Sequence, residues 1–341
     1  MSLELGLDTF GDITRKADGK LHSHDAVLRQ VLEEGVLADE LGVDFFGIGE
    51  HHREDFAVSS PETLLAGIAT RTKRIKLGSS VTVLSSDDPI RVYQRFATVD
   101  ALSNGRAEVT LGRGSFTESF PLFGFDLSQY ETLFEEKLEI FARLSKQPEV
   151  SWDGSHRTPL KKQKVYPPTA SGKLKTWVGV GGSPESVLRA ASHDLPLMLA
   201  IIGGSPARFR PFVDLHKRAH DQMGTPVQQI GVHSPGFVAP TDAEARDRYF
   251  AGYQVMHANI GRSRGWPPLT RVAFEQEVEH GSMYVGSPET VAKKIASTVK
   301  VLGLDRFQLK YSGGPVLAEH ALESVQLYGE KVAPMVRDML A

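Results

Sequence analysis

The sequence of 341 residues contains no cysteine. This absence excludes disulfide bonds, thiolate metal sites, iron–sulfur clusters and a cysteine nucleophile. Any chemistry must therefore come from histidines, carboxylates, arginines, hydroxyl groups or a bound cofactor. No metal site is predicted from the ligand types that remain.

The chain also lacks a long apolar run and an excess of charge of either sign. No stretch approaches the roughly 20 apolar residues of a membrane span, and the N-terminus does not resemble a signal peptide. The formal net charge of −3 gives no electrostatic reason to expect a nucleic acid or an anionic membrane as a partner. With 40% hydrophobic and 24% charged residues, the composition is that of an ordinary globular protein, and a cytoplasmic location is expected.

What the sequence does contain is a regular alternation of β and α segments. Apolar runs such as Val43–Ile48 end in glycine or polar residues, and helical patterns begin after signals such as Ser60-Pro61-Glu62. Eight βα repeats predict a single α/β domain over residues 1–341, a (β/α)8 TIM barrel rather than a six-stranded open sheet. The predicted strands span residues 3–8, 43–48, 75–84, 107–111, 176–180, 197–202, 229–238 and 306–311.

Two segments do not fit the repeat. A minimal barrel needs about 250 residues, which leaves roughly 90 for insertions. The best candidates are Pro148–Lys173 and Gly261–Ser287, both expected beside the catalytic, carboxyl-terminal face. The second carries Arg262, Arg264 and Trp266 among glycines and prolines. It is interpreted either as a mobile lid or as a plain surface loop.

Three adjacent groups that exchange protons, Glu50, His51 and His52, follow the predicted strand Val43–Ile48. The carboxyl end of a barrel strand is where such folds bind their ligands. Because successive residues of an extended chain point to opposite sides, one histidine is expected in the site and the other behind it. The alternative is a pair that caps a helix or only supports other groups.

Glycine-rich turns follow several other strands and share the same rim. Arg113 lies between two glycines, which clear the approach of an anion. In Gly181-Gly182-Ser183-Pro184-Glu185-Ser186 a strand joins a helix directly, so free amides and two hydroxyl groups suit a phosphate. An N-cap followed by proline is also a common helix start, and Gly-Ser-Pro recurs at 204–206 and 286–288, so an ordinary turn is the alternative.

Three further histidines of interest, His216, His220 and His233, lie in the second half of the chain. His233 is in the predicted strand 229–238, where it either points into the site or is a core histidine with its hydrogen bonds satisfied. His216 and His220 are four residues apart on a predicted helix, and the charged residues between them indicate a solvated face.

Together these segments resemble the bacterial luciferase-like, flavin-dependent monooxygenases. The resemblance rests on the order and spacing of five motifs, and it covers nearly the whole chain. The motifs are the strand that ends in Gly49-Glu50-His51-His52, then Arg74–Leu84, Ser103–Gly114, Trp177–Ser186 and Tyr284–Ala292.

The resemblance implies an FMN site at the carboxyl end of a modified barrel. His51 matches a histidine with acid–base roles in bacterial luciferase, and His233 lies close to a site histidine of alkanesulfonate monooxygenases. Arg262 or Arg264 resembles a lid arginine of the latter group. The cofactor-binding residues implied are Ser80 and Val81, at a non-proline cis peptide under the flavin; Arg113, Gly182, Ser183 and Ser186, at the phosphate, with the adjoining Gly181; and Ile201, in the isoalloxazine pocket.

The chain departs from bacterial luciferase at two positions. Gly112 stands where luciferase has a reactive cysteine, so any role of that thiol is absent here. Gly182 stands where luciferase has a glutamate near the phosphate.

The function that the resemblance implies is a monooxygenase that uses reduced FMN and O2 to oxidise a small organic substrate through a flavin C4a-peroxide. A separate NAD(P)H-dependent flavin reductase would supply the reduced FMN, and a homodimer is expected. The predicted catalytic residues are Glu50, His51, His52 and His233, with His51, oriented by Glu50 or His52, managing proton transfer. The alternatives are hydride transfer with a deazaflavin of the coenzyme F420 type and a noncatalytic flavin-binding protein.

Overall fold

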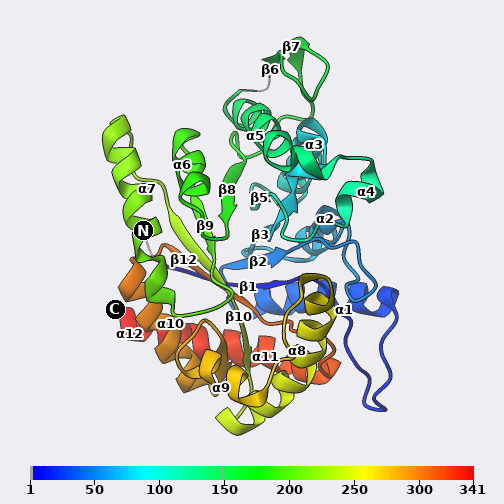
Figure 1. Ribbon diagram of the computed structural model, residues 1–341, viewed down its shortest axis with the longest axis vertical. Coiled ribbons are helices and arrows are strands. Elements are labelled where there is room, and N and C mark those ends of the chain that lie inside the picture. The colour runs from blue at the N-terminus through cyan, green and yellow to red at the C-terminus, as the bar shows by residue number, and fades with distance from the viewer. Residues whose placement is uncertain (1–2, 148) are drawn as a thin grey trace.

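The protein is described from a computed structural model over residues 3–147 and 149–341. Eight parallel strands close into a barrel, with helices packed around it (Figure 1), which confirms the predicted (β/α)8 architecture. The barrel closes because β10 pairs with β9 on one side and with β12 on the other. The barrel strands are β1 (Glu4–Thr9), β2 (Phe45–Ile48), β3 (Lys76–Ser79), β5 (Ala107–Gly112), β8 (Lys175–Val180), β9 (Leu197–Ala200), β10 (Ile230–Val238) and β12 (Arg306–Lys310).

The helices begin at the capping signals present in the sequence. The Asp88 side chain accepts hydrogen bonds from the backbone N–H groups of Ile90 and Arg91, and Pro89 occupies the first position of α3. Among the described residues, no helix has the length and apolar character needed to cross a membrane. The main helices are α1 (His24–Glu40), α2 (Pro61–Arg71), α3 (Pro89–Leu102), α4 (Ser119–Phe123), α5 (Tyr130–Lys146), α6 (Pro184–Ser192), α7 (Arg210–Met223), α8 (Asp242–Arg264), α9 (Arg271–Glu279), α10 (Pro288–Leu302), α11 (Ala318–Leu327) and α12 (Ala333–Leu340).

The single strand predicted over residues 75–84 is wrong, because the chain breaks in its middle. β3 ends at Ser79, the Ser80–Val81 peptide bond is cis, and the short β4 (Thr82–Val83) then pairs with β5. The resemblance placed a cis peptide at this position, whereas the uninterrupted apolar pattern of the segment gave no sign of the break.

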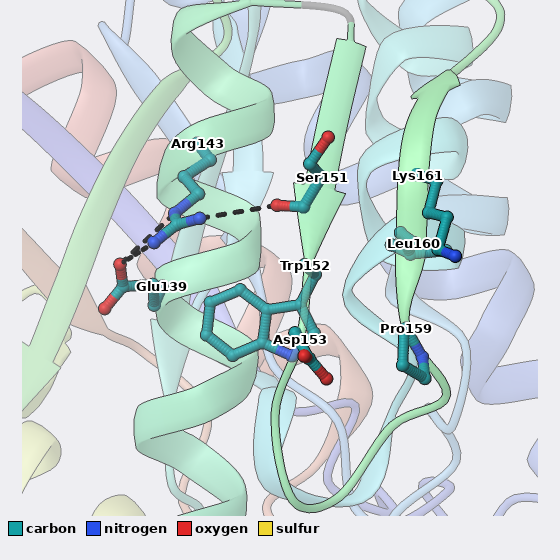
Figure 2. Close-up of a pocket in the computed structure, with 8 residues that line it drawn as sticks. All are labelled: Glu139, Arg143, Ser151, Trp152, Asp153, Pro159, Leu160 and Lys161. Atoms are coloured by element: carbon teal, nitrogen blue, oxygen red, sulfur yellow. Dashed lines mark hydrogen bonds and ion pairs between the residues drawn. The ribbon is translucent and has the colours of Figure 1, made fainter.

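The first predicted insertion contains an antiparallel hairpin of β6 (Glu149–Trp152) and β7 (Leu160–Lys164), which projects at the top of Figure 1. Pro148, where the predicted insertion begins, lies outside the described residues. A hollow of about 540 Å³ is lined by residues of the hairpin and of α5 (Figure 2). There Arg143 bonds both the Glu139 carboxylate, at 2.7 Å, and the Ser151 carbonyl, at 3.3 Å.

The second predicted insertion, residues 261–287, consists largely of regular structure rather than a loop. It comprises the end of α8, all of α9 and β11 (Tyr284–Gly286), which pairs with the carboxyl half of β10. Helix α9 buries Phe274 and Val278 in a second apolar cluster with Tyr249 of α8. The irregular chain is limited to residues 265–270 and 280–283 and to Ser287, the N-cap of α10.

The solvated face predicted for His216 and His220 on α7 is also wrong. Both side chains are fully buried, and their ring centroids lie 4.7 Å apart. Burial, reinforced by the neighbouring His220, lowers the pKa of His216 to about 4. The two rings are therefore neutral parts of the core near pH 7.

The amino end of the barrel interior is filled by a cluster of buried charges. The Arg306 guanidinium, which is fully buried, donates to both oxygens of Glu108, at 2.8 and 3.0 Å, and to Glu4, at 2.7 Å. The Trp177 indole N–H donates to Glu108 at 2.8 Å. This layer seals the barrel below the carboxyl-terminal rim, where the predicted site residues gather.

Candidate functional site

His51 lies just beyond β2 in a cage of aromatic rings at the carboxyl end of the barrel. Its ring centroid is 4.5 Å from those of Phe56 and Phe116 and 4.9 Å from that of Phe10. Its Nδ1 lies 3.5 Å from Oε1 of Glu118, a residue between β5 and α4. A histidine with a carboxylate beside one nitrogen and apolar rings around it can hold and transfer a proton away from bulk water.

The other two members of the Glu50–His52 motif have different partners. Glu50 accepts a hydrogen bond from the Val83 backbone N–H at 3.1 Å. Burial, reinforced by Asp87, raises the pKa of Glu50 to about 8 although the Val83 bond opposes the shift. His52 packs edge-on against Phe123, and burial lowers its pKa. The expectation that Glu50 or His52 orients His51 is therefore corrected, because the carboxylate beside the His51 ring belongs to Glu118.

His233 is held next to the same cage by Asp8. Its Nδ1 lies 2.8 Å from Asp8 Oδ2, and its ring stacks on Phe10 with 5.9 Å between centroids and 12° between planes. Phe10 thus contacts both His51 and His233. The structure brings the two predicted histidines to one aromatic side chain, and Asp8 is a partner that sequence reasoning missed.

A group of hydrogen-bond donors lies at the N-terminus of α6. Ser183 caps the helix by accepting from the Ser186 N–H, and its hydroxyl donates to Ser186 Oγ at 2.8 Å. Arg113, from the end of β5, and Arg189, from α6, each place a guanidinium nitrogen 3.3 Å from the same Ser186 oxygen. Three of the predicted phosphate-binding residues therefore meet in one place, which we call the anion cradle (Arg113, Ser183, Ser186 and Arg189).

The cradle fits a phosphate monoester. Two guanidinium groups and two hydroxyl groups, gathered at a helix N-terminus, supply donors and positive charge for an anion. Gly182 has φ +110°, which L side chains rarely adopt, so the glutamate of luciferase would be strained at this position. At Gly181 an added Cβ would meet no atom within 4 Å, so the turn is open on that side. Glu131 and Glu135, both on α5, pair with Arg113 and Arg189 through their carboxylates.

The predicted flavin-ring residues contact several strands of the barrel. Val81 packs into the space left by Gly112 and Gly179, and a Cβ at Gly112 would come within 2.6 Å of Val81 Cγ2. A cysteine at this position would therefore require Val81 to move. Ser80 donates to the Gln308 side chain at 3.2 Å, and the buried Ile201 donates its N–H to the His233 carbonyl at 2.9 Å.

Of the two proposed lid arginines, Arg264 reaches the site. It donates to the Ser115 carbonyl at 2.6 Å, and its guanidinium carbon lies 4.7 Å from the centre of the Phe116 ring. Arg262 instead bonds Asn259 within α8. The end of α8 therefore holds the connection that carries Phe116 and Glu118.

Six contributors were missed from the sequence: Asp8, Phe10, Phe56, Phe116, Glu118 and Arg189. Arg189 follows Ser186 by three residues on a helix, a spacing that places the two side chains on one face and would have identified it. Glu118 had no such signal, because it meets His52 across 66 positions of the chain. Among residues 3–147 and 149–341, no three His, Asp or Glu side chains gather as a metal site requires.

The chain is a closed (β/α)8 barrel with an anion cradle and a caged histidine at its carboxyl-terminal rim, where barrels of this class bind their ligands. A sequence model of the family described as luciferase-like monooxygenase matches residues 10–306, so the chain belongs to this family. The alkanal monooxygenase alpha chain of Photobacterium leiognathi is 24% identical over 346 residues, which cover 93% of this chain and 95% of that protein. Family membership identifies the protein as an oxidoreductase of the monooxygenase type.

Two solved structures share the fold. The first is described as the oxygenating constituent of 3,6-diketocamphane monooxygenase of Pseudomonas putida, a type II Baeyer–Villiger monooxygenase in complex with FMN; it has a TM-score of 0.76 at 19% identity and covers 98% of this chain and 99% of that one. The second is the coenzyme F420 dependent tetrahydromethanopterin reductase of Methanopyrus kandleri, with a TM-score of 0.73 at 17% identity, covering 98% and 99%. The same barrel is thus found with two different coenzymes.

Proposed function

We propose that this protein is an FMN-dependent monooxygenase that oxidises a small organic substrate with O2. The observation that carries the proposal is the anion cradle, in which Arg113, Arg189 and the capped start of α6 converge on one hydroxyl group. The cradle residues would hold the FMN phosphate, and Ser80 and Val81 would contact the flavin ring. Reduced FMN supplies the electrons that activate O2, and a separate NAD(P)H-dependent reductase would provide it.

The residues around His51 supply the rest of the chemistry. Phe10, Phe56 and Phe116 exclude water from the imidazole, and exclusion of water protects reactive intermediates from hydrolysis. His51 moves the proton that the oxygen chemistry or the substrate requires, with a neutral imidazole as acceptor and an imidazolium as donor. His233, bonded to Asp8, is a second proton-transfer group on the other side of Phe10.

Hydride transfer with a deazaflavin is the second candidate, supported by the fold shared with the F420 dependent reductase. We place FMN first because the exposed Glu131 and Glu135 pair with the two arginines of the cradle, and these carboxylates would repel a further anionic group beside the phosphate. A noncatalytic flavin-binding protein is the third candidate, and the caged His51 argues against it because storage needs no proton-transfer group.

The test is an anaerobic titration of the purified protein with reduced FMN, followed by admission of air in the presence of candidate substrates while flavin reoxidation is recorded. Arg113→Ala should weaken FMN binding about 10- to 150-fold, because a hydrogen bond to a charged group contributes about 1.5–3 kcal/mol. Arg143→Ala, which removes an arginine beside the distant hollow on α5, is the matched control and should leave the dissociation constant unchanged. Absence of FMN binding together with tight binding of F420 would overturn the proposal.

A further inference from the structure

The carboxylate of Glu118 is placed on the polar edge of the His51 ring. Glu118 Oε1 lies 3.5 Å from His51 Nδ1, and the same oxygen accepts the His52 backbone N–H at 3.4 Å. The two contacts converge on one oxygen, so the neighbouring backbone directs that oxygen toward the imidazole. Burial acts to raise the pKa of Glu118, but the bonds from His51 and from backbone N–H groups outweigh it and hold the pKa below its usual value.

The connection that carries Glu118 is anchored to two helices, α5 and α8. The Gly114 carbonyl accepts the Tyr130 hydroxyl at 2.5 Å, and the Ser115 carbonyl accepts the Arg264 guanidinium at 2.6 Å. Phe116 lies between these anchors and Glu118, against the His51 ring. The position of the carboxylate is therefore set by contacts with α5 and α8 as well as by His51.

The surroundings of His51 leave little choice of charged partner. Its ring contacts are the three aromatic side chains of the cage, and its backbone N–H donates to the Val58 carbonyl at 2.9 Å. Arg53, the nearest cation on the same segment, is paired with Asp55 at 2.9 Å, and Lys310 lies 4.6 Å from the Phe10 ring while bonded to Asp12 at 3.2 Å. His52 turns its ring to Phe123, His233 lies on Phe10 and is bonded to Asp8, and Arg264 lies over Phe116 and is bonded to the Ser115 carbonyl.

We propose that Glu118 is the positioning residue of His51: its carboxylate accepts the Nδ1 proton, fixes the neutral ring as the Nδ1–H tautomer and leaves Nε2 as the nitrogen that exchanges protons during the reaction. The assignment of His51 as the proton-transfer group rests on the proposed function, whereas the tautomer is a property of the protein alone. A carboxylate that orients an imidazole through one nitrogen prepares the other for proton transfer, because which nitrogen is protonated depends on the hydrogen bond that the other makes.

The experiment is 15N NMR of the histidine rings in the full-length protein without any ligand, at a pH where His51 is neutral. The His51 signals are assigned by their loss in His51→Gln. The wild-type protein should show the Nδ1–H tautomer, and an Nε2–H tautomer in the wild type would overturn the proposal before any variant is made. The result does not depend on FMN, so a failed FMN titration would sink the proposed function and leave this inference standing.

Three variants separate the hydrogen bond from packing and from charge. Glu118→Met keeps the shape but removes the acceptor, and it should shift His51 to the Nε2–H tautomer. Glu118→Gln keeps an acceptor oxygen, which the His52 N–H holds in place, so it should retain the Nδ1–H tautomer. Glu54→Gln removes an exposed negative charge three residues after His51 and should leave the tautomer of His51 unchanged. Retention of the Nδ1–H tautomer in Glu118→Met contradicts the proposal, and if that variant fails to fold, the wild type and Glu118→Gln decide.

Discussion

The two ends of the barrel differ in how their buried polar groups are paired. At the amino end, Arg306 is fully buried between Glu108 and Glu4. At the carboxyl end, Asp8 and Gln308 are buried to a similar degree, but each keeps a polar atom without a partner among the described residues. The amino-end cluster satisfies its charges within the protein. The carboxyl-end groups have hydrogen-bonding capacity left over. Buried polar atoms of this kind are costly, and they persist where a water or a ligand completes them.

The comparison indicates that one end of the barrel serves stability and the other serves binding. In (β/α)8 enzymes the ligands bind at the carboxyl end, and residues at the amino end mainly stabilise the fold. The difference is expressed in the charges themselves, because Arg306 makes bidentate bonds to Glu108 while Asp8 offers His233 only one of its two oxygens. Variants at the two ends should therefore differ most in their effect on the free energy of unfolding.

The largest effect is expected for Arg306→Met. It leaves Glu108 and Glu4 buried without their main cation, and removal of one partner from a buried ion pair costs about 3–5 kcal/mol. Urea unfolding at neutral pH measures the loss. Arg71→Met, which removes an arginine from an exposed pair with Glu33, is the control and should barely move the midpoint. Equal midpoints for the two variants would contradict a stabilising role for the amino end.

A pH titration of stability should distinguish the two ends by direction. Burial acts to raise the pKa of Glu108, but Arg306 outweighs it and lowers the value to about 2, so the stability contributed by Glu108 is present above its unfolded pKa and is lost as the pH falls from about 4.5 to 2. The pKa of Glu50 is instead raised to about 8 by burial, so its contribution is complete below about 4.5 and is lost as the pH rises toward 8. The stability contributed by the amino end therefore falls in acid, whereas the stability contributed by Glu50 at the carboxyl end falls toward alkaline pH.

Glu50→Gln sharpens this part of the comparison. The variant lacks the ionisation, so its stability should fall less than that of the wild type between about pH 5 and 8, where one proton changes the free energy of unfolding by up to about 1.4 kcal/mol per pH unit. Unfolding midpoints across this range provide the measurement. Parallel curves for the two proteins would show that Glu50 is not buried in the neutral form.

The parts of the molecule that were predictable from the sequence are those set by local pattern. The alternation of strands and helices gave the barrel, and the Gly-Gly-Ser-Pro turn with Ser186 gave most of the anion cradle. The rest depends on contacts between distant segments: Asp8 meets His233 across 225 positions, and a helix with Lys217 and Arg218 on its exposed side still buries His216. The charge of adjacent residues does not predict which face of a helix is buried. No pattern in the sequence predicts that a side chain of β1 contacts one of β10.

The smallest effect is expected for Asp8→Asn, although Asp8 is fully buried. The substitution removes a buried charge, and an asparagine oxygen can still accept the Nδ1 proton of His233, so the free energy of unfolding should change by less than about 1 kcal/mol. Glu108→Gln is the matched change at the amino end and should cost about 3 kcal/mol or more, because it leaves the buried Arg306 with only Glu4 as a close anionic partner. If the two substitutions lower the free energy of unfolding equally, Asp8 has a structural role like that of Glu108. If Asp8→Asn leaves stability intact but slows flavin reoxidation in air, the carboxylate contributes its charge to the chemistry at the rim.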